Sequence, residues 1–190
     1  MSRLPESVAL LIIDVQQAID DPAWAKHGPR NNPHAEENIA ALLAAWRRAG
    51  RTVVHVKHES AEPGSTYRPG QPGCEFKPCV APFAGEQVVV KHVTSAFIGT
   101  GLAETLRAAG VSCLVVCGVI TNNSVEATIR MAGNLGFDTW LAHDAAFTFA
   151  RPDYDGRPRS AAEVHAMSLA NLEGEYCRVA TTGEILAMIQ

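Results

Sequence analysis

Three side chains that can take part in acyl transfer follow apolar runs of this sequence. Asp14 comes directly after VALLII, Lys91 directly after QVVV, and Ser124 a short turn after CLVVC. A carboxylate accepts a proton, an ammonium polarises a carbonyl group, and a hydroxyl attacks that carbonyl. Each residue alone also has an ordinary explanation, as a cap, a solvated strand end or part of a first helical turn. Their combination is what indicates a catalytic site.

Short β-rich apolar runs alternate with helical patterns along the chain. Strands are predicted at 8–13, 52–56, 87–90, 113–117, 137–142 and 176–180, and helices at 34–49, 102–109, 124–135, 161–172 and 184–189. Such alternation is typical of a parallel sheet with helices on both faces. We therefore expect a single domain over residues 1–190 with a three-layer α/β/α, Rossmann-like fold and a six-stranded, mostly parallel sheet.

The predicted strands bring the three reactive residues to one edge. In open parallel sheets, ligands bind beyond the carboxyl ends of the strands, and Asp14, Lys91 and Ser124 follow the ends of three different strands. The fifth strand is expected to end at His143 and Asp144. A glycine-containing turn before Ser124 directs backbone N–H groups and the positive end of a helix towards a developing oxyanion.

The composition argues against several other classes of protein. The 190 residues carry a formal net charge of -4 and no basic stripe, so no nucleic-acid partner is expected. No apolar run approaches the ~20 residues that span a bilayer, and the amino terminus lacks the layout of a signal peptide. Five cysteines, an odd number at spacings that match no zinc site, favour the reducing cytoplasm over a disulfide framework.

Four blocks of the sequence resemble the isochorismatase-like (cysteine hydrolase) superfamily, which includes nicotinamidases, ureide hydrolases and isochorismatase. They are ALLIIDVQ (9–16), VVKHVTSAF (89–97), CGVITNNSVEATIRMAGNLGF (117–137) and HDA (143–145), in the family's order across nearly the whole chain. Each block is weakly specific alone, but the ordered set is strong. The resemblance implies a small-molecule hydrolase that assembles as a homo-oligomer, a dimer or a tetramer.

The resemblance also implies roles for particular residues. Asp14 matches the family's general base, and Lys91 matches the lysine that polarises the substrate and orients the nucleophile. The turn before Ser124 matches a segment that commonly contains a cis peptide, expected here between Val119 and Ile120. The backbone N–H groups of Ile120 and Ser124 would then form the oxyanion hole.

Serine at position 124 departs from the amidase members of the family, which have cysteine there. A thiol ionises near pH ~8.5, whereas a serine hydroxyl is far less acidic and is poorly activated without a histidine. Three explanations remain open: an engineered replacement, a natural serine nucleophile, or chemistry that needs no nucleophile. Three functions also remain open: hydrolysis of a C–N bond in a small amide, imide or ureide with acyl transfer to residue 124, Asp14-driven hydrolysis of a vinyl ether without a nucleophile, and a catalytically impaired binding protein.

Neither a metal nor another cofactor is expected. Nicotinamidases of the superfamily carry an Asp-x-His ligand set after the second strand, and residues 55–64 (HVKHESAEPG) lack it, which also disfavours nicotinamide as the substrate. The candidate substrate contacts, for which ordinary packing remains an alternative, are Gln16, His58, Arg68, Phe97 and Asn123.

Two irregular segments, 59–86 and 145–160, exceed the usual length of a connection in a compact domain. The first is rich in proline and glycine, and we interpret it as a lid or a subunit contact in preference to a disordered loop. Several aromatic residues near the predicted active edge either line a pocket or pack in the core: Phe83, Phe97, Phe147, Phe149 and Tyr154.

Overall fold

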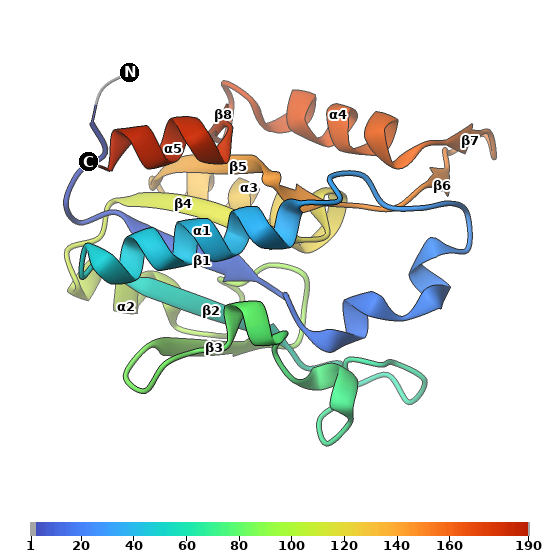
Figure 1. Ribbon diagram of the computed structural model, residues 1–190, viewed down its shortest axis with the longest axis horizontal. Coiled ribbons are helices and arrows are strands. Elements are labelled where there is room, and N and C mark those ends of the chain that lie inside the picture. Colours follow the sequence, from blue (N-terminus) through green and yellow to red (C-terminus); the bar gives the residue numbers. More distant parts are fainter. Residues whose placement is uncertain (1–2, 190) are drawn as a thin grey trace.

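The computed structural model describes residues 3–189 and contains a central six-stranded sheet (Figure 1). Its strands are β1 (Ala9–Ile13), β2 (Val53–His58), β3 (Gln87–Lys91), β4 (Cys113–Val119), β5 (Asp138–Phe147) and β8 (Arg178–Ala180). The spatial order is β3-β2-β1-β4-β5-β8, and every neighbouring pair is parallel. The predicted α/β fold is therefore confirmed, with a sheet that is fully parallel where a mostly parallel one was expected.

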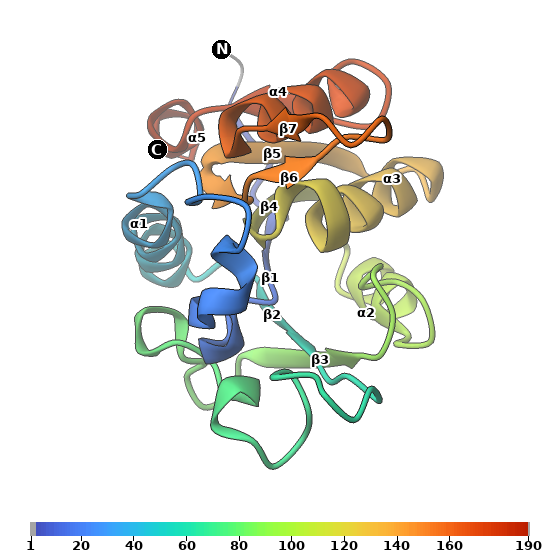
Figure 2. The same ribbon diagram turned by 90° about the vertical axis from the view of Figure 1, so that its right-hand side faces the viewer.

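Helices cover both faces of the sheet and complete the three layers (Figure 2). The helices are α1 (Ala35–Arg48), α2 (Leu102–Ala108), α3 (Glu126–Asn134), α4 (Ala161–Leu172) and α5 (Thr182–Met188). Residues of α1 and α5 pack on one face, and residues of α2, α3 and α4 pack on the other. Capping boxes begin α4 at Ser160 and α5 at Thr181, where each hydroxyl accepts a hydrogen bond from a backbone N–H three residues later.

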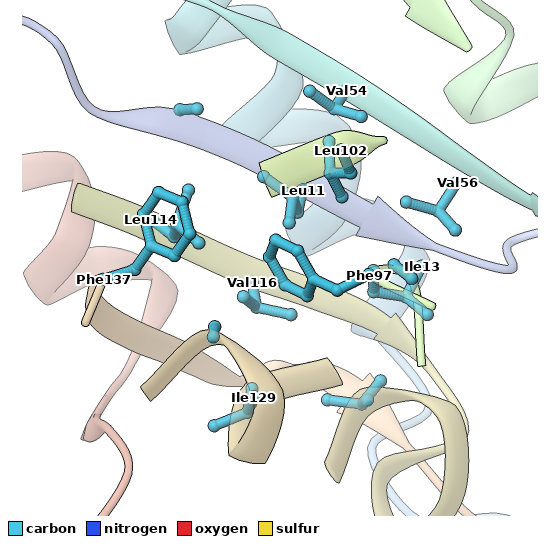
Figure 3. Close-up of a cluster of buried hydrophobic side chains, with 14 of the residues drawn as sticks. Leu11, Ile13, Val54, Val56, Phe97, Leu102, Leu114, Val116, Ile129 and Phe137 are labelled. Atoms are coloured by element: carbon cyan, nitrogen blue, oxygen red, sulfur yellow. The ribbon is translucent and has the colours of Figure 1, made fainter. Parts of the chain in front are cut away.

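One of the two main hydrophobic clusters lies between the sheet and helices α2, α3 and α4 (Figure 3). Leu11 and Val116 reach it from the central strands, and Phe97 stacks on Phe137 with 5.7 Å between ring centroids. Such offset aromatic pairs add to the free energy gained by burying the rings. The cluster fixes the segment after β3 against α3, and these are the elements that flank Lys91 and Ser124.

The strand order reverses direction between β1 and β4. The chain first builds outward through β2 and β3 and then crosses to β4, so the crevice at the carboxyl ends of β1 and β4 is the topological switch point where such sheets bind ligands. Gly118 lets these two strands approach closely. Its φ is +118°, and a Cβ built there would lie 2.2 Å from the carbonyl oxygen of Ile13, so no other residue fits.

Several boundaries differ from the sequence prediction: β8 begins at Arg178 where 176 was expected, and α5 begins at Thr182 where 184 was expected. The fifth strand was expected to end at His143 and Asp144, but β5 continues to Phe147. The pairing register shifts between Val116 and Gly118, and the strand resumes pairing beyond that irregularity. Asp144 is therefore not at a strand end; its carboxylate instead accepts hydrogen bonds from the backbone and hydroxyl of Thr182 at the start of α5.

The predicted helix 124–135 also begins differently. A π-helical turn, η5 (Thr121–Val125), precedes α3 and contains Ser124. Single π turns within helices are frequent at functional sites.

The irregular segment 59–86 contains two short 3-10 turns, η3 (Pro72–Cys74) and η4 (Pro78–Val80). The segment 145–160 contains a small hairpin of β6 (Arg151–Pro152) and β7 (Pro158–Arg159). No helix within residues 3–189 has the length and apolar character needed to cross a membrane.

Candidate active site

Asp14, Lys91 and Ser124 meet at the carboxyl edge of the sheet. Lys91 Nζ lies 2.7 Å from Asp14 Oδ2 and donates a hydrogen bond to Ser124 Oγ at 3.3 Å. All three residues are less than 10% exposed, at 4%, 1% and 8% respectively. The structure thus brings together three residues that come from the ends of β1 and β3 and from the turn after β4.

Asp14 has both an unusual backbone and an unusual electrostatic setting. Its φ is +54°, in the left-handed region that aspartate tolerates better than most residues and that often marks a functional position. Burial raises the pKa of Asp14 above its ordinary value, although the neighbouring Lys91 ammonium opposes the rise. Oδ1 is buried without a hydrogen-bond partner in the described part of the chain, so one carboxylate oxygen is free to accept a proton.

All three protons of the Lys91 ammonium group have an acceptor. Besides Asp14 and Ser124, it donates to the carbonyl oxygen of Val93 at 3.1 Å, which gives three acceptors for three protons. These contacts fix the cation between the carboxylate and the hydroxyl. A fixed positive charge at this position lowers the proton affinity of Ser124 Oγ and favours negative charge developing nearby.

The turn that carries Ser124 is held from behind by α4. The peptide bond between Val119 and Ile120 is cis, at the position expected from the sequence. The hydroxyl of Thr121 lies 2.9 Å from His165 Nδ1, and the hydroxyl of Ser168 donates to Glu126 Oε2 at 2.6 Å. Two residues of one helix therefore contact the residues on either side of Ser124, which keeps the turn in place.

Gln16, a predicted substrate contact, instead holds two segments of the backbone together. Its side chain is fully buried; Nε2 donates to the carbonyl oxygens of His58 at 2.9 Å and Cys74 at 2.8 Å, while Oε1 accepts from the His58 N–H at 2.8 Å. This amide has no free group for a substrate. Its role is to join the end of β2 to η3.

His58 lies beside the lysine, as its register position requires. It pairs with Lys91 across β2 and β3, and the edge of its ring packs against Tyr67 with 5.7 Å between centroids. Burial, followed by the charge of Lys91, lowers the pKa of His58 to about 4, so the imidazole is neutral near pH 7. His58 Nδ1 is buried without a hydrogen-bond partner among the described residues.

The other predicted contacts lie elsewhere. Phe97 packs in the core against Phe137, away from solvent, because its ring is needed between β3 and α3. Arg68 is exposed and donates to the carbonyl oxygen of Pro63 at 3.1 Å within its own loop. Asn123 is exposed on the turn, one residue before Ser124. Of these three, only Asn123 borders the reactive residues along the chain.

A cavity of about 680 Å³ adjoins the turn before Ser124 through Ile120 and Asn122, and sequence reasoning missed most of its wall. Trp24, Tyr67 and Phe149 line it together with Ile120 of the cis-peptide turn. Only Phe149 was among the aromatic candidates; Phe147 is buried in a small core cluster, while Phe83 and Tyr154 are exposed elsewhere. The missed signal was the presence of Trp24 and Tyr67 in the irregular segments that follow β1 and β2.

The described residues offer no obvious metal centre and no alternative thiol. Among residues 3–189, no group of three or more histidine, cysteine or acidic side chains is arranged to hold a metal ion. Cys117 is fully buried on β4, and burial raises the pKa of its thiol. Cys74 lies behind Gln16, and burial raises its pKa as well. Neither has the lowered pKa of a reactive cysteine.

Comparison with known proteins identifies the family of this chain. A family model described as the isochorismatase domain matches residues 8–184. The isochorismatase family protein YrdC of Bacillus subtilis is 41% identical over 183 residues, which cover 96% of each chain. The crystal structure of an isochorismatase-family protein from Chromobacterium violaceum is 59% identical with a TM-score of 0.95, covering 99% of this chain and 96% of that one.

Two relatives carry names that specify an activity. Streptothricin hydrolase of Streptomyces noursei is 41% identical over 147 residues, which are 76% of this chain and 51% of that protein. Maleamate amidohydrolase of Pseudomonas putida is 30% identical over 196 residues, covering 96% of this chain and 86% of that protein. The extent of the family match, together with these identities and coverages, shows that the chain is a member of the isochorismatase family of hydrolases.

Proposed function

We propose that the protein hydrolyses a C–N bond of a small amide, imide or ureide, with Asp14, Lys91 and Ser124 as its catalytic residues. One observation carries the proposal: three groups meet at the topological switch point. They are the buried carboxylate of Asp14, whose Oδ1 has no hydrogen-bond partner among the described residues, the ammonium of Lys91, whose three protons are all hydrogen-bonded, and the hydroxyl of Ser124. A buried ion pair of this kind costs desolvation energy and adds little to stability. Its presence beside a cavity is therefore better explained by catalysis.

The proposed reaction has two halves. Asp14 Oδ1 takes the proton from Ser124 Oγ as this oxygen attacks the carbonyl carbon, and the carbonyl π electrons move to the oxygen. The tetrahedral oxyanion faces the backbone N–H groups of Ile120 and Ser124. When it collapses, the C–N bond breaks and Asp14 returns the proton to the leaving nitrogen. Water, deprotonated by Asp14, then attacks the ester on Ser124; as the C–O bond to Ser124 breaks, Asp14 returns this proton to Ser124 Oγ and the acid is released.

Because a serine hydroxyl is less acidic than a cysteine thiol, Ser124 needs stronger activation from the residues around it. The raised pKa of Asp14 makes its carboxylate a stronger base than an exposed aspartate. The hydrogen bond from Lys91 to Ser124 Oγ stabilises the alkoxide as it forms. Both effects act on the same proton transfer. Streptothricin hydrolase and maleamate amidohydrolase, both related to this chain, support the choice of an amide-like substrate.

A second candidate function is Asp14-driven hydrolysis of a vinyl ether. It is favoured by the raised pKa of Asp14, because a carboxyl group that keeps its proton to higher pH is able to donate it to an enol-ether carbon. In that reaction Ser124 forms no covalent bond. The two functions differ in whether Ser124 is required.

The test is product release from a panel of small amides, imides and ureides, with a vinyl ether alongside. The parent is compared with Ser124→Cys and Ser124→Ala, and Asp14→Asn serves as the blank. Ammonia or amine release by the parent that disappears in both Ser124→Ala and Asp14→Asn supports the proposal. Vinyl-ether turnover that survives Ser124→Ala but not Asp14→Asn favours the second function. Binding without turnover in all forms contradicts both.

We further propose a homo-oligomer, a dimer or tetramer, that works in the cytoplasm. Exposed apolar side chains support the first point, among them Val88 and Val90 on the edge strand β3 and Met167 on α4, which is 64% exposed. Five free cysteines support the second. Sedimentation of the purified protein checks the assembly: a single species of the 20.3 kDa monomer mass at micromolar concentration would contradict it.

A further inference from the structure

The cavity beside the active site is walled by aromatic rings. Trp24 and Phe149 are stacked, with 6.0 Å between centroids and 23° between planes, and Tyr67 meets Trp24 edge-on at 6.3 Å. These residues come from η2 (Pro22–Ala25), the loop after β2 and the segment after β5, which lie far apart in the sequence. We refer to Trp24, Tyr67 and Phe149 as the aromatic wall.

The polar edge of Trp24 is already satisfied. Its indole N–H donates to the carbonyl oxygen of Ala18 at 2.9 Å, so the ring is held in one orientation. Opposite, the hydroxyl of Thr148 donates to Asn122 Oδ1 at 2.5 Å, so these two polar side chains are also paired. The aromatic wall gives the cavity flat apolar surface, beside the charged and polar side chains that also line it.

The aromatic wall contacts the neighbours of the reactive residues. Tyr67 packs on His58, which neighbours Lys91, and the negative charge of Asp14 contributes to raising the pKa of Tyr67, after the larger effect of burial. Ile120 lines the same cavity and begins the turn that carries Ser124. The cavity therefore adjoins the turn that carries Ser124, although Asp14, Lys91 and Ser124 do not line it themselves, and we assign the substituent of a carbonyl group bound at Ser124 to this cavity.

Size and charge narrow the choice of substituent. A volume of about 680 Å³ is within the range of pockets that hold drug-sized ligands and far exceeds what acetamide or urea fills. The acidic side chains that line the cavity are Asp21 and Glu62, and its lysine and arginine side chains are Lys26 and Arg151, so these four charges balance. Neither an anionic nor a cationic substituent is favoured by this lining.

We propose that the aromatic wall is the specificity-determining element of the site and selects carbonyl substrates bearing a flat, uncharged ring. This inference rests on the proposed function for the identity of the scissile bond. A planar ring stacks on Trp24 and Phe149, whereas a puckered aliphatic ring of the same size makes contact through fewer atoms. Aromatic pairs of this type correspond to about a 2- to 12-fold gain in affinity.

Binding of two matched ketones tests the inference without any reaction. Acetophenone and cyclohexyl methyl ketone have the same carbonyl group and a six-membered ring, differ in planarity, and lack a leaving group. Titration of the full chain by calorimetry or ligand-observed NMR gives the ratio of their dissociation constants. We expect acetophenone to bind about 5- to 10-fold more tightly.

Variants of the aromatic wall test whether these residues cause the preference for acetophenone. Trp24→Leu and Phe149→Leu should each bring the ratio towards one, while Trp24→Phe, which keeps a flat ring, should retain most of it. Tyr154→Leu is the matched control, because this aromatic side chain is fully exposed and does not line the cavity. Circular dichroism identifies any variant that fails to fold, and the other wall variant then gives the answer.

The possible outcomes separate this inference from the proposed function. Equal affinities for the two ketones, or a preference unchanged in both Trp24→Leu and Phe149→Leu, would overturn the inference even if amides are hydrolysed. A preference that depends on the wall upholds it even if no amide in the panel is cleaved.

Discussion

Two ionic clusters in this protein have similar ingredients and opposite properties. At the end of β3, Asp14 and Lys91 form a buried pair in which Asp14 Oδ1 has no partner. At the start of β3, Glu86 receives two hydrogen bonds from Arg47 at 2.7 Å and further ones from His55 and the N–H of Phe83. The first cluster is incomplete, and the second is saturated.

The pKa values of the two carboxyl groups follow from that difference. Hydrogen bonds from Arg47 lower the pKa of Glu86 to about 2, although partial burial opposes this. Burial raises the pKa of Asp14, and the opposing effects of Lys91 and Ser124 do not reverse the rise. A carboxylate with all its oxygens occupied stabilises the fold, whereas one with a vacant oxygen and a raised pKa is suited to exchange protons.

The largest expected effect comes from Asp14→Asn. Because the vacant oxygen is the proposed proton acceptor, turnover of any substrate found in the panel should fall by about 10²- to 10⁴-fold. The matched change in the saturated cluster, Glu86→Gln, should leave the rate constant within about twofold. Steady-state kinetics on both variants checks this contrast, and an equal loss of activity in the two would refute the division of roles.

Lys91→Met should produce a pH-dependent loss of stability. Without the ammonium, the pKa of Asp14 rises further, so the fold favours the protonated form more strongly. Stability is then retained at low pH and lost as pH rises through the raised pKa, by up to about 3–5 kcal/mol if the charge remains buried. Thermal melts between pH 5 and 9 measure this trend. In Asp14→Asn/Lys91→Met the pH dependence should disappear; a persistent trend would assign it to another group.

Gln16→Leu tests how much the hydrogen bonds of the buried Gln16 amide, beside the reactive cluster, stabilise the fold. The change leaves the His58 N–H and two carbonyl oxygens without their partner, at a cost of about 2–4 kcal/mol. For a chain of this size, that corresponds to a melting temperature lower by about 5–10 °C. Gln17→Leu is the control, since Gln17 is exposed. Equal melting temperatures for the two variants would show that the buried amide is dispensable.

The smallest effect is expected for the stability of Glu86→Gln. The lowered pKa of Glu86 stabilises the fold fully above its ordinary value of 4.5, and this contribution is lost as pH falls towards about 2. The variant should therefore be less stable by about 1–2 kcal/mol at pH 7 and should approach the parent in acid. Urea denaturation at pH 7 and pH 3 measures both values; a constant difference would mean that the charge is not responsible.

Most of the fold followed from local patterns. Continuous apolar runs such as 113–117 mark strands that are covered on both faces, and the span 161–172 agrees with α4 at both ends. The extension of β5 to Phe147 had no such signal, because it depends on a register shift against β4. The π-helical turn at Ser124 was likewise missed, since its sequence also fits an ordinary first turn.

The site shows the same limits at the level of single residues. Asp14, Lys91 and Ser124 could be placed together because strand ends meet at one edge of a parallel sheet. Gln16 could not be assigned, because a buried amide and a substrate-binding amide have the same sequence signal. Trp24 and Tyr67 lie in irregular loops, whose paths depend on long-range contacts that the pattern of apolar residues does not encode.

The close approach of β1 and β4 at Gly118 has a consequence for how this protein can change. With the two backbones in contact there, the sheet sets the spacing between Asp14 and the start of the turn bearing Ser124. Trp24, Tyr67 and Phe149 stand on separate connections that this seam does not constrain. Mutational libraries confined to those three positions should therefore yield altered substrate preferences at high frequency, while libraries at position 118 should yield almost no folded clones.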